Sequence, residues 1–214
     1  MTAGSADDSE PDADGSGTGW PVALAGVTET VVTTLGPNKR WNIAALGVHA
    51  PDGNGPVTAT TWGRTRTWRN FRERGGGYVQ FTRDPVDFAE AALSVREEDD
   101  PVLDSADAWV EVEVERRDSG SEGDTQWVEW ALHPVDSAVE RRVVPTTNRG
   151  HAAVVEATVA ASRLGVPSYD RETLLDRLAY FESVVETAGS ERERAAFERV
   201  RDLVDAEWEG FHTE

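Results

Sequence analysis

The chain has 214 residues with 40 acids against 21 bases, so its formal net charge is -19, and it contains no cysteine. The absence of cysteine excludes disulfides, thiol nucleophiles and thiolate metal sites. The negative charge disfavours binding to nucleic acid or to an acidic membrane surface, because both require a broad cationic face.

Lys39 is the only lysine, and an acidic, lysine-poor chain is typical of a protein adapted to high salt. No apolar run approaches the roughly 20 residues that a membrane span requires. The first residues have neither the basic nor the apolar region of a signal peptide. We therefore expect a cytoplasmic protein.

Residues 1–18 carry acidic and small side chains without a large apolar residue, so we expect a disordered acidic tail there. Residues 27–35 are rich in β-branched side chains and precede a Gly-Pro-Asn turn, which predicts a strand. Residues 41–48 predict a second strand that forms a hairpin with the first. Residues 57–62 predict a third strand.

The segment 64–74 is a basic island, with five arginines and a single acid. We predict a short helix capped by Thr65 or Thr67 and ended by the glycines at 75–77. Arginine forks, hydroxyl groups and the backbone donors of a helix start all suit a phosphate. In high salt the screening length falls to about 3 Å at 1 M, so only bonds at contact distance would act. The alternative is that these arginines pair with neighbouring carboxylates on a solvated helix.

The remainder of the β-rich part alternates turns with short apolar runs. It predicts a strand at 78–82, a helix opened by Asp84 and Pro85, an acidic loop at 97–107, an alternating strand at 109–115, a hairpin loop at 117–124, a returning strand at 126–132 and a further strand at 139–144. From residue 147 onwards the apolar period is helical.

Three helices follow. The first is capped by Asn148 and ends at Gly165, the second stops at Gly189, and the third opens with the capping box Ser190–Glu193. We therefore expect three parts: the tail at 1–18, a body of six or seven strands at 19–146, and a helical region at 147–214.

Polar and small side chains in the second strand are compatible with a flat ligand. Asn42 opens this strand, and Ala44, Ala45 and Gly47 would let a planar ring lie close to the backbone. Donors at the end of a neighbouring strand could then hold the ligand's phosphate tail. Ordinary core packing is the alternative for each of these residues.

Four segments, in this order, resemble an archaeal family catalogued as a domain of unknown function (domain of unknown function 447). They are Glu29–Thr34, Asn42–Val48, Thr65-x-Thr67-x-x-Asn70, and Asn148-Arg149-Gly150 with the helix that follows. The resemblance covers nearly all of the chain from Gly26 onwards and identifies it as a haloarchaeal-type member. It implies an FMN-binding split β-barrel, a C-terminal three-helix appendage and a homodimer.

The resemblance also implies site residues. Thr65 and Thr67 would bind the FMN phosphate, Arg64 or Arg66 would add charge, and Asn70 would fix the loop. Here Arg64 and Thr65 replace a Gly-Ser pair of the family, and Ala45 replaces a proline.

Two further pairs complete the set that the resemblance implies. Asn42 and Ala44 would face the isoalloxazine ring or the ribityl chain. Asn148 and Arg149 would hold an anion at a helix start. For this second pair, a plain N-cap and a surface arginine is the alternative.

No catalytic residue is identified. His49, His133, His151 and His212 lack the paired spacing of metal ligands, and no metal site is expected. Glu29 and Glu156 lie in apolar runs, so we expect partial burial. No dinucleotide fingerprint is present, so NADH or NADPH would have to stack on the flavin without a Rossmann domain.

Three functions stay open. The first is an FMN-dependent oxidoreductase of unknown substrate. The second is a non-catalytic FMN carrier or redox sensor. The third is an interaction module without flavin, in which the basic island binds an acidic partner.

Overall fold

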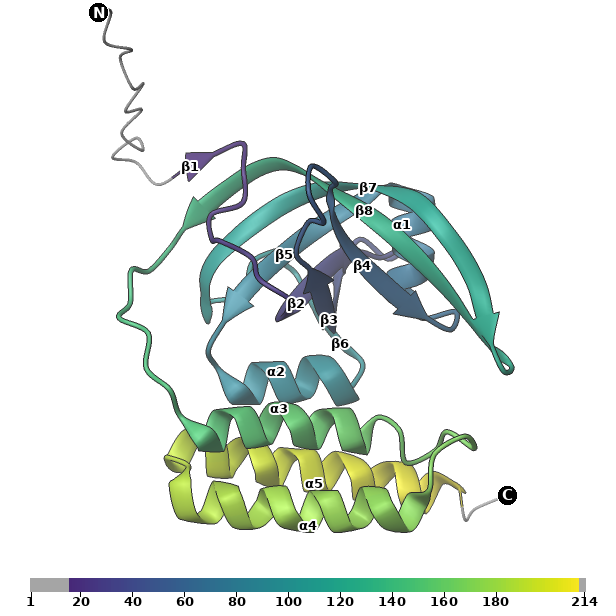
Figure 1. Ribbon diagram of the computed structural model, residues 1–214, viewed down its shortest axis with the longest axis vertical. Helices are drawn as coiled ribbons and strands as arrows, with labels where there is room; N and C mark the ends of the chain where they lie inside the picture. The colour runs from purple at the N-terminus through teal and green to yellow at the C-terminus, as the bar shows by residue number, and fades with distance from the viewer. Residues whose placement is uncertain (1–15, 212–214) are drawn as a thin grey trace, which may run out of the picture.

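Six antiparallel strands close into a barrel in the order β8-β4-β3-β2-β5-β7, with β7 pairing back onto β8. The computed structural model describes residues 16–211, with side chains from 18 to 204. Figure 1 shows the barrel above a layer of helices. The barrel strands are β2 (Val27–Leu35), β3 (Trp41–His49), β4 (Val57–Trp62), β5 (Gly76–Thr82), β7 (Ala106–Glu122) and β8 (Thr125–Val139).

The barrel interior is a single apolar cluster. Val32, Val79 and Val110 are fully buried within it. Phe71, from the helix α1 (Arg66–Arg74), meets the Trp130 ring edge-on at a centroid distance of 5.5 Å. This contact anchors α1 against the barrel.

The expected split β-barrel is confirmed, and the split lies between β3 and β4. These strands pair only at Val48 with Ala59 and at His49 with Thr58. The short strand β6 (Arg96–Glu98) takes the same edge of β3 at residues 41–43. Residues 44–47 therefore pair with β2 on one edge, and no described strand pairs with them on the other.

Several expectations for the β-rich part were wrong. The hairpin loop expected at 117–124 is mostly strand, because β7 and β8 stay paired as far as Glu122 and Thr125. This long hairpin extends beyond the barrel, so both of its faces are polar and the apolar alternation fades. The acidic loop expected at 97–107 contains part of β6 and the start of β7, and β8 ends at Val139 without a further strand.

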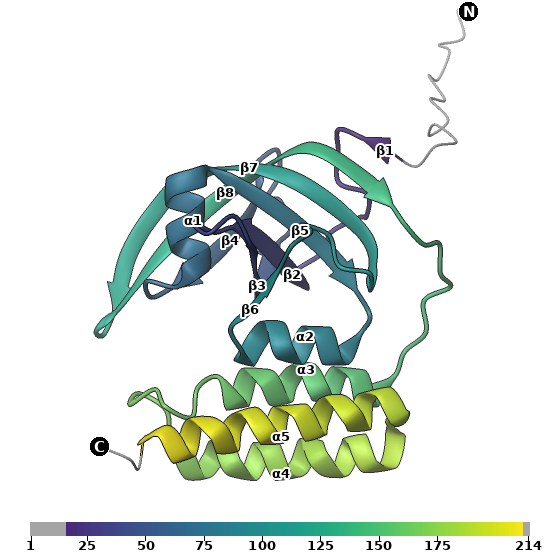
Figure 2. The ribbon, with the colours of Figure 1, turned by 180° about the vertical axis from the view of Figure 1, so that it is seen from behind.

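The three expected C-terminal helices are confirmed as α3 (Arg149–Ala161), α4 (Arg171–Ala188) and α5 (Glu191–Phe211), although α3 ends at Ala161 and not at Gly165 as expected. Figure 2 shows them stacked beneath α2 (Pro85–Leu93). Phe88 of α2 packs with Val31 and Ile43 of the barrel, while the adjacent Ala89 packs with the helical layer. The helix α2 therefore joins the barrel to the appendage.

The expected acidic tail lies largely outside the described residues, which exclude 1–15. Its last part differs from the expectation, since Ser16 and Gly17 form β1 and pair with Ala138 and Ser137 of β8. No helix among residues 16–211 is both long and apolar enough to cross a bilayer.

Candidate functional site

The β4–α1 junction places the basic island at the end of a barrel strand. Gly63, directly after β4, has a φ of 71°, a value that favours glycine, and its N–H donates to the Gln126 carbonyl at 2.7 Å. Thr65 is the N-cap, and its hydroxyl accepts from the Trp68 N–H at 3.2 Å. Thr65, rather than Thr67, is therefore the capping residue.

A pocket of about 250 Å³ lies beside the start of α1, between this helix, β6 and the β2–β3 turn. It brings together three of the residues expected from the sequence, Asn42, Arg66 and Asn70. It also includes Arg69, which lies one helical turn after Arg66. The remaining lining residues are Gly36, Pro37, Asn38 and Glu97. We call this cavity the α1 pocket.

The charges of the α1 pocket are only partly neutralised. Arg66 pairs with Glu97 at 2.7 Å, and the other oxygen of this carboxylate accepts from the Asn38 amide at 2.9 Å. Arg69 has no carboxylate within ion-pair distance in the part of the chain that the structure describes. Arg66 is therefore ion-paired, as the alternative interpretation expected. The guanidinium of Arg69 has N–H donors that remain available for an anion.

Two buried polar side chains of α1 differ in how they are satisfied. The Asn70 amide donates to the Thr34 hydroxyl at 2.9 Å and to the Thr34 carbonyl at 3.4 Å, which ties α1 to the end of β2. Thr67 is 4% exposed, and its hydroxyl makes no hydrogen bond with the described residues. Thr67, like Thr65, is not among the residues that line the α1 pocket.

Arg64 and Ala44 lie at the margins of this site. Arg64 is exposed, and its Nε donates to the Gln126 side chain at 3.4 Å. The Ala44 side chain packs against the barrel core, whereas Ala45 faces α2 and α3. The Ala44 backbone instead pairs with Val32 of β2, because the bonds from the Gly36 N–H to the Arg40 carbonyl and from the Ala50 N–H to the Gly26 carbonyl make the even-numbered residues of β3 the hydrogen-bonded partners of β2. Ala45 and Gly47 therefore direct their N–H and C=O groups to the open edge of β3, and Ala44 does not.

The structure does not bring Asn148 and Arg149 to the α1 pocket within one chain. Asn148 caps α3, where its Oδ1 accepts from the Gly150 N–H at 2.8 Å, and Arg149 is exposed. Figures 1 and 2 both show the start of α3 at the end of the helical layer that lies away from α1.

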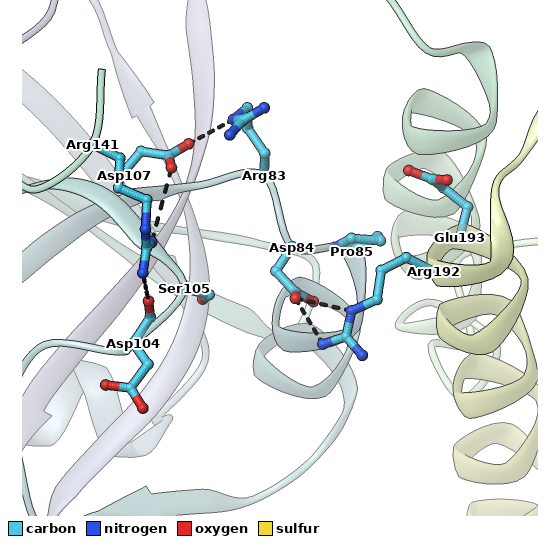
Figure 3. Close-up of a pocket in the computed structure, with 9 residues that line it drawn as sticks. All are labelled: Arg83, Asp84, Pro85, Asp104, Ser105, Asp107, Arg141, Arg192 and Glu193. Carbon is cyan, nitrogen blue, oxygen red and sulfur yellow. Dashed lines mark hydrogen bonds and ion pairs between the residues drawn. The ribbon is translucent and has the colours of Figure 1, made fainter. Parts of the chain in front are cut away.

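A separate polar pocket of about 400 Å³ lies where the barrel meets α2 and α5 (Figure 3). Arg83 pairs with Asp107 at 2.6 Å, and Arg192 pairs with Asp84 at 2.6 Å. Arg141 donates to the Ala106 carbonyl at 3.0 Å. Each of these arginines already has an ion pair or a hydrogen bond within the protein. We therefore interpret this pocket as part of the contact between the barrel and the helical layer.

Of the two acids expected to be partly buried, Glu156 is exposed, which corrects the expectation, whereas the carboxylate of Glu29 is partly enclosed. Glu156 pairs with Arg177 at 3.3 Å. Glu29 is exposed as a whole residue, but its carboxylate is partly enclosed. Burial and the nearby Glu156 raise the pKa of Glu29, while His49 opposes this shift. Among residues 18–204, whose side chains the structure describes, no three His, Asp or Glu side chains gather in a way that could hold a metal ion.

Two family models match the chain. One, described as protein of unknown function (DUF447) N-terminal domain, matches residues 28–141. The other, described as protein of unknown function (DUF447), matches residues 148–202. Together they cover both the barrel and the C-terminal helices.

Solved structures share the fold. An FMN-bound protein from Methanosarcina mazei, assigned to the same family model, is 23% identical with a TM-score of 0.73, over 85% of this chain and 96% of that one. Component B of nitrilotriacetate monooxygenase from Mycobacterium thermoresistibile is 20% identical, with a TM-score of 0.37 over 55% and 72% of the two chains. Flavoredoxin from Methanosarcina acetivorans is 12% identical, with a TM-score of 0.39 over 55% and 72%.

Proposed function

The chain belongs to the DUF447 family, and from this membership we propose that it is an FMN-binding flavoprotein. The Methanosarcina mazei member with the same fold is described as FMN-bound. One observation carries the proposal for this chain: Asn42 of β3 lines one pocket with Arg66 and Asn70 of α1, a helix that is distant from it in sequence.

The phosphate of FMN would lie at the first turn of α1. Arg66 and Arg69 supply positive charge there. The Thr67 hydroxyl, on the same turn of α1 but outside the lining of the pocket, would supply a further donor. The unpaired N–H groups and the dipole of the helix start favour the same anion. Arg64 and Thr65 complete this end of the site, with Thr65 holding the cap that orients those N–H groups.

The isoalloxazine ring of FMN would lie at the split of the barrel, between β3 and β4. FMN supplies the redox chemistry when it is bound, and the protein supplies orientation and electrostatics. The open edge of β3 offers the backbone donors and acceptors of Ala45 and Gly47 at fixed spacing, while the backbone of Ala44 is bonded to β2. Asn42, 5% exposed, adds a side-chain amide at the same end of this strand.

FMN titration of two variants tests the phosphate position. In the double variant Arg66→Ala/Thr67→Val, a charged donor and a hydroxyl are lost, and we expect FMN binding to weaken roughly 100-fold. The eight tryptophans make fluorescence quenching a direct readout. Arg74→Ala removes the same charge from the other end of α1 and should leave the affinity within about threefold of wild type. Equal affinities for all three proteins would show that the phosphate binds elsewhere.

We further propose that the flavoprotein is an oxidoreductase whose substrate and reductant are not yet known. Anaerobic addition of NADH or NADPH to the purified holoprotein should then bleach the flavin absorbance. A flavin that resists both nucleotides and other cellular reductants would favour a carrier or a redox sensor. A colourless protein that ignores added FMN would favour the interaction module.

Three features of the assembly belong to the same proposal. We propose a homodimer adapted to high salt, with its two structural parts divided between residues 146 and 147. Asn148 and Arg149 would contribute to the FMN site only across a subunit interface, since within one chain they lie away from α1. A monomer by light scattering in concentrated KCl would remove them from the site.

A further inference from the structure

A third cavity lies at the end of β4, directly before the β4–α1 junction. It measures about 470 Å³, within the range of about 300–1,000 Å³ that small-molecule sites occupy. Trp62 at the end of β4 lines it from the barrel, and Tyr169 lines it from the α3–α4 connection. The tip of the β7–β8 hairpin, at residues 122–125, also reaches it. Figures 1 and 2 both show this tip and the α3–α4 connection on the same side of the molecule.

The cavity has two aromatic walls that the fold leaves uncovered. Trp62 is 50% exposed and Tyr169 is 45% exposed, although both belong to well-formed parts of the structure. Their rings come from different layers, one from the barrel and one from the appendage. Paired aromatic surfaces with open space between the elements that carry them suit a planar ring, which can gain contact with both.

An arginine adds charge to the same cavity. The Arg163 guanidinium lies 5.1 Å from the centroid of the Tyr169 ring. It has no carboxylate within ion-pair distance among residues 18–204, although Glu122 also lines the cavity. In a chain with 40 acids, a partly buried arginine without an ion pair keeps its donors free for an anionic group.

We propose that the cavity between Trp62 and Tyr169 binds the planar aromatic ring system of a negatively charged ligand. This inference rests on the proposed function. The ligand is a nicotinamide nucleotide that reduces the flavin, since it combines a flat ring with phosphate, and the ring of the FMN itself is assigned to the open edge of β3, which does not line this cavity. Trp62 precedes Thr65 by three residues, a span of at most about 10 Å. A ring in this cavity is therefore adjacent to a phosphate or a flavin held at α1.

Two variants test the cavity, and each has a matched control. Trp62→Leu removes one aromatic wall, and Arg163→Gln removes the charge while keeping a polar side chain. Tyr180→Leu and Arg142→Gln make equivalent changes at exposed positions outside every described pocket. Thermal melting in concentrated KCl verifies that all four variants are folded.

The readouts are the affinity for FMN, followed by flavin fluorescence, and the concentration of NADPH or NADH that half-saturates anaerobic flavin reduction. We expect Trp62→Leu and Arg163→Gln each to raise the half-saturating nucleotide concentration fivefold or more, by roughly the worth of one stacking or charged contact, while the affinity for FMN stays within about twofold of the controls. Loss of FMN affinity in these variants would place the flavin ring here instead of at β3 and would overturn the inference.

The inference is overturned if both variants match their controls in both readouts while Arg66→Ala/Thr67→Val still loses FMN. In that case the proposed function stands without this cavity. A wild-type protein that binds no FMN overturns the proposed function itself, and the inference with it.

Discussion

The hydrogen bond between Asn70 and Thr34 couples the position of α1 to the end of β2, and its contribution to stability is measurable. Asn70 is 3% exposed and Thr34 is fully buried. Asn70→Leu removes the bonds at 2.9 and 3.4 Å and leaves the Thr34 hydroxyl without a partner. A lost hydrogen bond costs about 0.5–1.5 kcal/mol and a stranded buried group about 1–3 kcal/mol, so we expect about 2–3 kcal/mol.

The reverse change strands the other partner. Thr34→Val keeps the shape of the side chain but removes the acceptor of the shorter bond, at a cost of about 1–2 kcal/mol. Replacing both residues by apolar groups strands neither side chain. The double variant should therefore lose only about 1 kcal/mol, which gives a coupling energy of at least about 2 kcal/mol.

These variants form a double-mutant cycle. Urea unfolding in concentrated KCl, followed by circular dichroism, measures the free energy of unfolding of the wild type, the two single variants and the double variant. Asn54→Leu makes the same substitution at an exposed loop position and should stay within about 0.5 kcal/mol of wild type. The reasoning is refuted if the double variant costs the sum of the two single variants. The two side chains would then be energetically independent, and Asn70 would not position α1.

Two further predictions concern charged groups. Because burial and Glu156 raise the pKa of Glu29, its stabilising contribution is present below its usual pKa of about 4.5 and is lost as the pH rises through the folded-state pKa. Glu29→Gln should therefore raise the Tm at neutral pH. The control Glu186→Gln, at an exposed site, should leave the Tm unchanged. An unchanged Tm for Glu29→Gln would contradict the assignment of the raised pKa to burial and to Glu156. Arg192→Ala breaks an exposed pair with Asp84 and should cost no more than about 1 kcal/mol in urea unfolding. Asp84→Ala also removes the α2 cap and should cost about 1 kcal/mol more, so equal losses would show that the cap contributes nothing.

Elements that depend on local signals could be predicted from the sequence. The bounds of β2 and β4 agree with the β-branched runs at 27–35 and 57–62. The caps at Asp84 and Asn148 and the capping box at Ser190 were also correct, since each depends on a side chain that bonds to a backbone N–H two or three residues away.

Elements that depend on pairing could not be predicted in this way. The β7–β8 hairpin continues to Glu122 because each strand supplies the hydrogen-bond partners of the other. Beyond the barrel this hairpin has no core to face, so its sequence lacks the alternation that predicts a strand. The strand β6 is three residues long and reads as part of an acidic loop until its pairing with β3 is known.

The sequence by itself determined the β-rich body, the three helices and the arginine-rich helix start, because periodicity, caps and local charge are written in neighbouring residues. Tertiary structure alone decided which of these residues meet. It placed Asn42 beside Arg66 and Asn70, left Asn148 at the other end of the helical layer, and brought Trp62 and Tyr169 to one cavity. The reason is that these contacts follow from barrel closure and from helix packing against the barrel, and neither is set by the order of residues along a single element.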